Sequence, residues 1–169
     1  STVHVTPGMP EACRRAAAES MVLLKNDGIL PLRPTDTVAV FGRCQCDTFY
    51  VGYGSGGDVC PPYKVSYIAG LAEAAADGRV RLDDDLRRLY ADWSARPENR
   101  PNEGTWGNWP MHYPEMPVSS DLAMAHAETA DVAVVILGRA AGEDRENTLE
   151  KGSYYLTDEE RTLLDAVTA

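Results

Sequence analysis

The stretch DVAVVILG, residues 131–138, decides the fold of this chain. From Val132 to Leu137 every side chain is apolar, so both faces of an extended segment would be buried. A strand of this kind is typical of the middle of a parallel sheet that is covered by helices. The charged stretch RAAGEDRENTLEKGSYYLT, residues 139–157, follows at once. Because ligands bind beyond the carboxyl ends of the strands in open α/β sheets, this loop is predicted to carry function.

Helical and strand patterns alternate along the rest of the chain. The valine-rich run TVAVFG at residues 37–42 predicts a second strand, and RVRL at residues 79–82 predicts a weak third one. Helices are predicted over residues 10–26, 65–78, 83–93, 121–131 and 157–169. The apolar side of the first comprises Ala12, Ala16, Ala17, Met21 and Leu24. The order predicts an α/β sandwich, with an open and mostly parallel sheet flanked by helices.

Cap residues support two of these helices. Ser119 or Ser120 stands where an N-cap is needed before residues 121–131. Thr157 and Glu160 have the spacing of a capping box, which predicts that the last helix begins there.

The chain is predicted to have two parts. Residues 1–36 form an N-terminal helix and lead-in, and residues 37–169 form the sandwich, interrupted by an aromatic, proline-rich insert at 94–118. The last helical pattern still runs at Ala169, so the sandwich is expected to be incomplete, with one strand lacking a neighbour. Such an apolar edge favours association or poor stability of the isolated chain.

The composition and net charge indicate which kinds of molecule this protein can bind. The 169 residues are 44% hydrophobic and 25% charged, which is ordinary for a globular protein. Sixteen Lys and Arg against 26 Asp and Glu give a net charge of −10, which disfavours nucleic acid and acidic membrane surfaces as partners. No apolar run approaches the roughly 18 residues of a membrane span, and the N-terminus lacks a secretory pattern. A cytoplasmic protein with a neutral small-molecule partner is expected.

Four cysteines raise the question of a metal site or a disulfide. They are Cys13, Cys44, Cys46 and Cys60. No histidine lies near them in sequence, the Cys-x-Cys spacing is unlike a zinc knuckle, and their density is far below that of a small secreted scaffold. Reduced thiols in a cytosolic protein, with neither metal nor cofactor, are therefore expected.

The loop GYGSGG, residues 52–57, matches the G-x-G-x-x-G pattern of dinucleotide-binding folds. In that pattern the first glycine follows the strand directly and the last opens a helix. Here several residues separate Gly42 from Gly52, and Pro61 and Pro62 precede the next helix, so a dinucleotide site is disfavoured. Two interpretations remain: a glycine loop whose Ser55 contacts a small polar ligand, and a plain long connection.

Three stretches together carry a family resemblance. AAAESMVLLKNDGILPL, VAVFGR with GYGSGG, and ADVAVVILGRAAGEDRENTLEKGSYYLTDEERTLLDAV occur in this order. They resemble the second, α/β-sandwich domain of glycoside hydrolase family 3, the family of β-glucosidases and related exo-acting enzymes. The resemblance is weakest over residues 79–118. It is greatest to members in which this domain precedes the catalytic barrel.

The resemblance implies a role for the charged loop. In this family the nucleophile is an aspartate of a (β/α)8 barrel, outside this chain, and the acid/base is a glutamate on a loop of the sandwich domain. The matching residue is Glu143, with Asp144 as the second choice. Arg139 and Arg145 are interpreted as holding the loop or pairing with neighbouring carboxylates. The family's nucleophile motif has a chance likeness at Asp92 and Trp93, which end a predicted helix and are interpreted as structural.

The insert concentrates aromatic side chains. Trp106, Trp109 and Tyr113 lie close together in sequence, and sugar rings stack on aromatic faces. Trp106 and Trp109 are therefore predicted in the leaving-group subsite, and the alternative is that they anchor the insert on its own domain. His112 could bond a sugar hydroxyl, although a lone loop histidine is usually a surface residue.

The resulting prediction is part of an exo-acting retaining β-glycosidase that acts on terminal, non-reducing β-linked sugars. Its partners would be a carbohydrate substrate and the barrel domain, with a homo-oligomer left open. The isolated chain is expected to be inactive, because displacement needs both carboxylates. The alternative is a non-catalytic α/β module that binds a sugar or a nucleotide.

Overall fold

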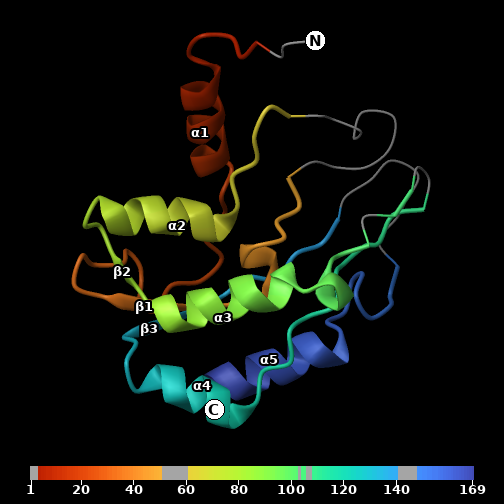
Figure 1. The fold of residues 1–169 in the computed structure, drawn as a ribbon. Helices are drawn as coiled ribbons and strands as arrows, with labels where there is room; N and C mark the ends of the chain where they lie inside the picture. The colour runs from red at the N-terminus through yellow and green to blue at the C-terminus, as the bar shows by residue number, and fades with distance from the viewer. Residues whose placement is uncertain (1–3, 51–60, 103, 106–107, 141–147) are drawn as a thin grey trace.

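The structure is a computed structural model that describes residues 4–50, 61–102, 104–105, 108–140 and 148–169. A parallel three-stranded sheet forms its centre, in the order β2-β1-β3 (Figure 1). The strands are β1 (Thr37–Phe41), β2 (Arg81–Leu82) and β3 (Val132–Val135). Val38 lies opposite both Leu82 and Val132, so the two outer strands are in register with β1. The predicted parallel α/β fold is confirmed.

The described residues form five helices, four of which lie around the sheet, while the first stands away from it (Figure 1). They are α1 (Met9–Glu19), α2 (Tyr67–Ala76), α3 (Asp84–Ala95), α4 (Ser120–Ala127) and α5 (Asp158–Thr168), with 3-10 turns η1 (Arg43–Gln45) and η2 (Pro97–Asn99). Each of α2, α3, α4 and α5 begins with an N-cap side chain that accepts a hydrogen bond from a backbone amide. These N-caps are, in order, Ser66, Asp83, Ser119 and Thr157. Both halves of the Thr157–Glu160 capping box are formed, as the sequence predicts.

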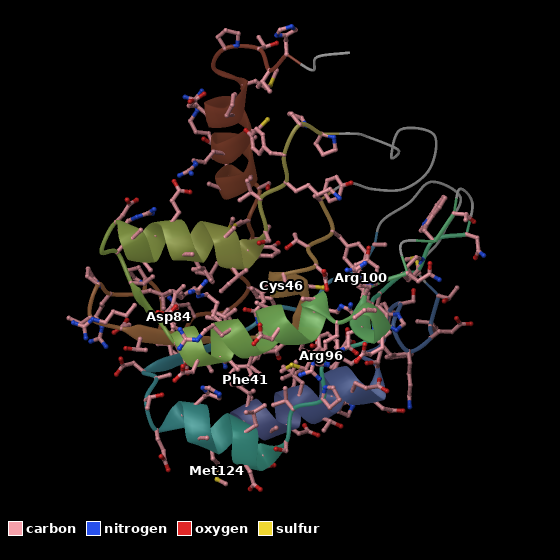
Figure 2. All side chains as sticks on the ribbon, viewed as in Figure 1. Phe41, Cys46, Asp84, Arg96, Arg100 and Met124 are labelled. Atoms are coloured by element: carbon pink, nitrogen blue, oxygen red, sulfur yellow. The ribbon has the colours of Figure 1, made fainter. Side chains whose placement is uncertain are left out.

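Alternate side chains of β1 enter two separate cores. Ala39 and Phe41 pack with Leu86 and Tyr90 of α3 and with Leu163 of α5. On the opposite face, a second cluster joins β1 to α2; it contains Val38, Val40 and Val80, with Ile68 and Leu71 packed against them. Figure 1 shows α2 on one side of the sheet and α4 and α5 on the other. Figure 2 shows Phe41 within the inner layer and Met124 of α4 pointing outward, in agreement with their exposures of 2% and 59%.

The positions of the two long strands correct the sequence prediction. β1 is central, and β3 lies at an edge of the described sheet, where Ala133 is exposed. Three of the four residues of β3 are partly buried and none is fully buried, whereas four of the five residues of β1 are buried. Within the described residues no strand pairs with the outer side of β3.

The first helix is shorter than predicted. It ends at Glu19, and no side chain of it is buried. Beyond it, the Asn26 side chain accepts from the backbone N–H groups of Gly28 and Leu30 and donates to the carbonyl of Leu30. This local turn competes with helical hydrogen bonds, and no buried apolar stripe favours the helix over it. Met21 and Leu24, predicted on the helix's apolar side, are instead 73% and 92% exposed.

Candidate active site

The carboxyl ends of β1 and β3 meet at the edge where function was predicted. Gly42 follows β1 with φ of 94°, and a β-carbon there would overlap the carbonyl of Ile136 after β3. The hydroxyl of Tyr90 accepts a hydrogen bond from the Gly42 amide at 2.9 Å. Glycine is therefore required at position 42 by both its conformation and the close approach of the second strand.

The segments beyond the two strands also pack on each other. A β-carbon on Gly138 would overlap Cys44 and lie 3.0 Å from the ring of Phe49. Phe49 in turn stacks on Tyr113 of the insert, with ring centroids 4.4 Å apart. The insert thus lies against the turn after β1, and this turn lies against the start of the loop after β3.

Arg43 ties the insert to the end of β1. Its side chain is 2% exposed, and the guanidinium carbon lies 4.9 Å from the ring centroid of Trp93. Nε donates to Asp47, Nη1 donates to the carbonyl of Pro114 at 2.6 Å, and Nη2 donates to the carbonyl of Asn99. One buried cation therefore satisfies backbone acceptors at both ends of the insert. Its contact with the Trp93 ring, which also packs against the core, agrees with the structural interpretation of Trp93.

Glu115 fixes the same junction from the other side. Its carboxylate is buried and accepts from the amides of Arg43, at 2.8 and 2.9 Å, and of Met116, at 2.7 Å. Burial raises the pKa of Glu115 to about 7, and the two amide bonds offset only part of that effect. The carboxyl is therefore a buried group that titrates near neutral pH.

We expect Glu115 to make the stability of this junction depend on pH. The unfolded chain releases the proton near pH 4.5 and the folded chain near 7, so this contribution is complete below pH 4.5 and lost as pH rises through 7. The loss corresponds to about 3 kcal/mol of unfolding free energy. Glu115→Gln keeps an acceptor oxygen and should remove this dependence, as measured by hydrogen exchange of the insert between about pH 5 and pH 8.

Glu98→Gln is the matched control, because it removes an exposed carboxyl from the same insert. It should leave the pH dependence of the wild-type protein in place. Equal pH dependence in Glu115→Gln and the wild type would show that Glu115 does not titrate in this range.

Arg139 holds the base of the charged loop. Its Nε donates to the carbonyl of Ser153 at 2.9 Å, and Nη2 donates to the carbonyl of Tyr155 at 3.3 Å. Nη1 and Nη2 donate to the two carboxylate oxygens of Glu160, both at 2.6 Å. The arginine thus joins the start of the loop to its end and to the first turn of α5, and its predicted loop-holding role is confirmed.

Glu160 serves two structures at once. It completes the capping box by accepting from the Thr157 amide at 2.9 Å, and it receives the fork of Arg139. Burial raises its pKa, but the bonds from Arg139 and Thr157 outweigh this, so the pKa of Glu160 lies below its ordinary value. The capping-box spacing predicts only the contact with Thr157. The ion pair with Arg139 was not predicted, and the only hint of it in the sequence was the arginine twenty-one residues earlier.

The predicted site residues fall partly outside the described part of the chain. Glu143, Asp144 and Arg145 lie there, as do Ser55 and Trp106 of the predicted sugar contacts. Trp109 is described, and its side chain is in the interior, at 5% exposure. That burial favours the alternative in which Trp109 anchors the insert.

Three of the four cysteines lie in the described part of the chain. Cys13, Cys44 and Cys46 are free cysteines, and Cys60 lies outside the described ranges. Burial raises the pKa of Cys44 to about 12, which makes it an inert thiol. None of the helices described is long and apolar enough to cross a membrane.

The sequence is similar to known proteins along most of its length. The sequence model of one protein family, the glycosyl hydrolase family 3 C-terminal domain, matches residues 21–169. A β-glucosidase of Ruminococcus albus is 38% identical over 157 residues, covering 93% of this chain and 16% of that protein. Beta-glucosidase A of Butyrivibrio fibrisolvens is 30% identical over 175 residues, covering 90% of this chain and 20% of that protein.

Solved structures agree with the family match. A β-glucosidase from Paenibacillus barengoltzii superimposes with a TM-score of 0.89 at 41% identity, covering 96% of this chain and 17% of that one. β-Glucosidase 3B from Thermotoga neapolitana, solved with α-D-glucose, gives 0.77 at 29% identity, covering 96% and 22%. The chain therefore spans about a fifth of the length of these relatives. Since the family match extends over most of its residues, the chain belongs to the glycosyl hydrolase family 3 C-terminal domain family.

Proposed function

We propose that this chain is one domain of an exo-acting retaining β-glucosidase that hydrolyses terminal, non-reducing β-linked sugars. The observation that carries the proposal is the loop after β3, which Arg139 fastens at both ends in a chain related to β-glucosidases. The relatives are about five times longer, which leaves room for a catalytic barrel. We place this domain before the barrel, and we propose that the enzyme is cytoplasmic, with a homo-oligomer as an open alternative.

Glu143 is proposed as the acid/base. A retaining glycosidase needs two carboxyl groups about 5 Å apart, one to attack the anomeric carbon and one to protonate the departing oxygen. The barrel would supply the nucleophile and this loop the proton donor. Partial burial beneath the barrel would raise the pKa of a carboxyl, as a general acid at neutral pH requires. Arg139 is bonded to Glu160, so its charge is already paired at the base of the loop.

Ser55 and Trp106 are the proposed sugar contacts, and Trp109 is retained only as a support of the insert. If the Ser55 hydroxyl bonds a sugar hydroxyl, Ser55→Ala should weaken binding by about 1 kcal/mol, or roughly fivefold in the inhibition constant of glucose. Ser20→Ala, at the end of α1, is the control and should bind glucose as the wild type does. An unchanged inhibition constant in Ser55→Ala would make the glycine loop a plain connection.

The proposal is tested by activity and by titration of the complete polypeptide that contains this domain. It should hydrolyse aryl β-glucosides and show no heat of binding with dinucleotides. Binding of a dinucleotide or a sugar without any hydrolysis would favour the non-catalytic binding module instead.

A further inference from the structure

The insert contacts both ends of the segment that carries Glu143. That segment, residues 141–147, begins after Ala140 and ends before Thr148. Ala140 is 3% exposed, and its amide donates to the carbonyl of Met111 at 2.7 Å. The next residue of the insert, His112, lies against Gly152, on the far side of the same loop. Two consecutive residues of the insert thus contact both flanks of the proposed acid/base segment.

The contact between His112 and Gly152 leaves no room for a side chain. Gly152 is buried and has φ of 80°, and its amide donates to the carbonyl of Tyr155 at 2.7 Å. A β-carbon on Gly152 would lie 2.9 Å from Nε2 of His112 and closer still to Nδ1 and Cε1. The imidazole therefore occupies the place that a side chain at position 152 would take.

The turn at Gly152 is itself joined to the end of the segment. The Thr148 amide donates to the hydroxyl of Ser153 at 3.1 Å, and the Tyr154 amide donates to the carbonyl of Thr148 at 3.2 Å. The Arg139 bond to the Ser153 carbonyl closes the connection back to the first flank. A displacement of Gly152 is therefore transmitted to Thr148 through hydrogen bonds and not only along the chain.

We infer that His112 is a positioning residue for the acid/base. Its imidazole packs against Gly152, and the turn at Gly152 holds Thr148, the residue that follows the Glu143 segment. The inference rests on the proposed function of Glu143. It gives the insert a task in catalysis that does not require a contact between the insert and the sugar.

A misplaced proton donor has a recognisable kinetic effect. Glycosides with poor leaving groups need protonation of the departing oxygen, whereas a dinitrophenolate departs with little help. A shift of about 1 Å in a catalytic group can lower a rate by about a hundredfold. A displaced loop should therefore slow cellobiose hydrolysis far more than hydrolysis of 2,4-dinitrophenyl β-glucoside, and a general loss of folded protein would slow both equally.

The test uses four variants of the complete enzyme. Gly152→Ala drives a methyl group into the imidazole, and His112→Ala removes the imidazole. The double variant His112→Ala/Gly152→Ala relieves the overlap while retaining the backbone strain of alanine at positive φ. Gly78→Ala is the matched control, because Gly78 also has positive φ, 71°, but its β-carbon would meet nothing within 4 Å.

For Gly152→Ala, kcat/KM for cellobiose should fall by about 10- to 100-fold and that for the dinitrophenyl glucoside by less than about threefold. His112→Ala should show the same selectivity more weakly, the double variant should be clearly less impaired than Gly152→Ala, and Gly78→Ala should match the wild type. Equal losses on both substrates, or a double variant as impaired as Gly152→Ala, would overturn the inference. A wild-type enzyme inactive on both glucosides would instead refute the proposed function, and the inference with it.

Discussion

Glu143→Gln in the complete enzyme should lower kcat/KM for cellobiose by about a thousandfold or more, because general acid catalysis contributes about 10²- to 10⁴-fold. Glutamine preserves the shape of the side chain but transfers no proton. The departing sugar of cellobiose is a poor leaving group, so its oxygen must be protonated as the glycosidic bond breaks. This is the largest effect on activity that we expect from any substitution in the chain.

The same variant should behave differently with an activated substrate. For 2,4-dinitrophenyl β-glucoside, kcat/KM should fall by less than about tenfold, since formation of the glycosyl-enzyme needs little protonation. Steady-state kinetics on both substrates measure the difference. Asp144→Asn is the matched control and should keep the leaving-group dependence of the wild type. If Asp144→Asn showed the selective loss and Glu143→Gln did not, Asp144 would be the acid/base.

The largest effect of a single substitution on stability at constant pH is expected at Arg139. Arg139→Met should lower the local unfolding free energy of the loop and α5 by about 3 kcal/mol, because it leaves the buried carboxylate of Glu160 without its cation. The side chain of Glu160 is 5% exposed, so water cannot replace the lost bonds fully. Hydrogen exchange of peptides from residues 148–169 should show about a hundredfold loss of protection.

Lys151→Met provides the control for Arg139→Met. It removes the same charge from a bidentate pair with Asp158, but both partners are largely exposed, at 65% and 75%. Exposed pairs contribute about 0–1 kcal/mol, so protection of the same peptides should change little. Equal losses in the two variants would mean that the Arg139–Glu160 pair adds no more than a surface ion pair.

Local patterns in the sequence predicted much of the fold. The valine-rich runs gave β1 and β3, and Ser119 and Thr157 are N-caps as expected. These features depend on residues close together in the chain, so a short window contains their physical cause. Helical periodicity alone missed that α1 has no buried side chain and that Asn26 forms a local turn where the helix was predicted to continue.

The junction between the insert and the sheet could not be predicted in this way. Arg43 bonds Pro114 across 71 residues, and Glu115 accepts from the Arg43 amide across 72. No periodic pattern links such positions, and a lone buried charge has no local sequence signature. The proposed acid/base, by contrast, followed from a family motif, and the pair with Glu160 explains the charged residue Arg139 at the start of that loop.

Azide rescue of Glu143→Gln tests the central proposal most directly. With 2,4-dinitrophenyl β-glucoside the glycosyl-enzyme should accumulate, because no base activates water for the second step. Azide is already anionic and needs no base, so we predict that it restores turnover and yields β-glucosyl azide, with net retention of configuration. No rescue and no azide product, together with equal losses on all substrates, would contradict the assignment of Glu143 as the acid/base.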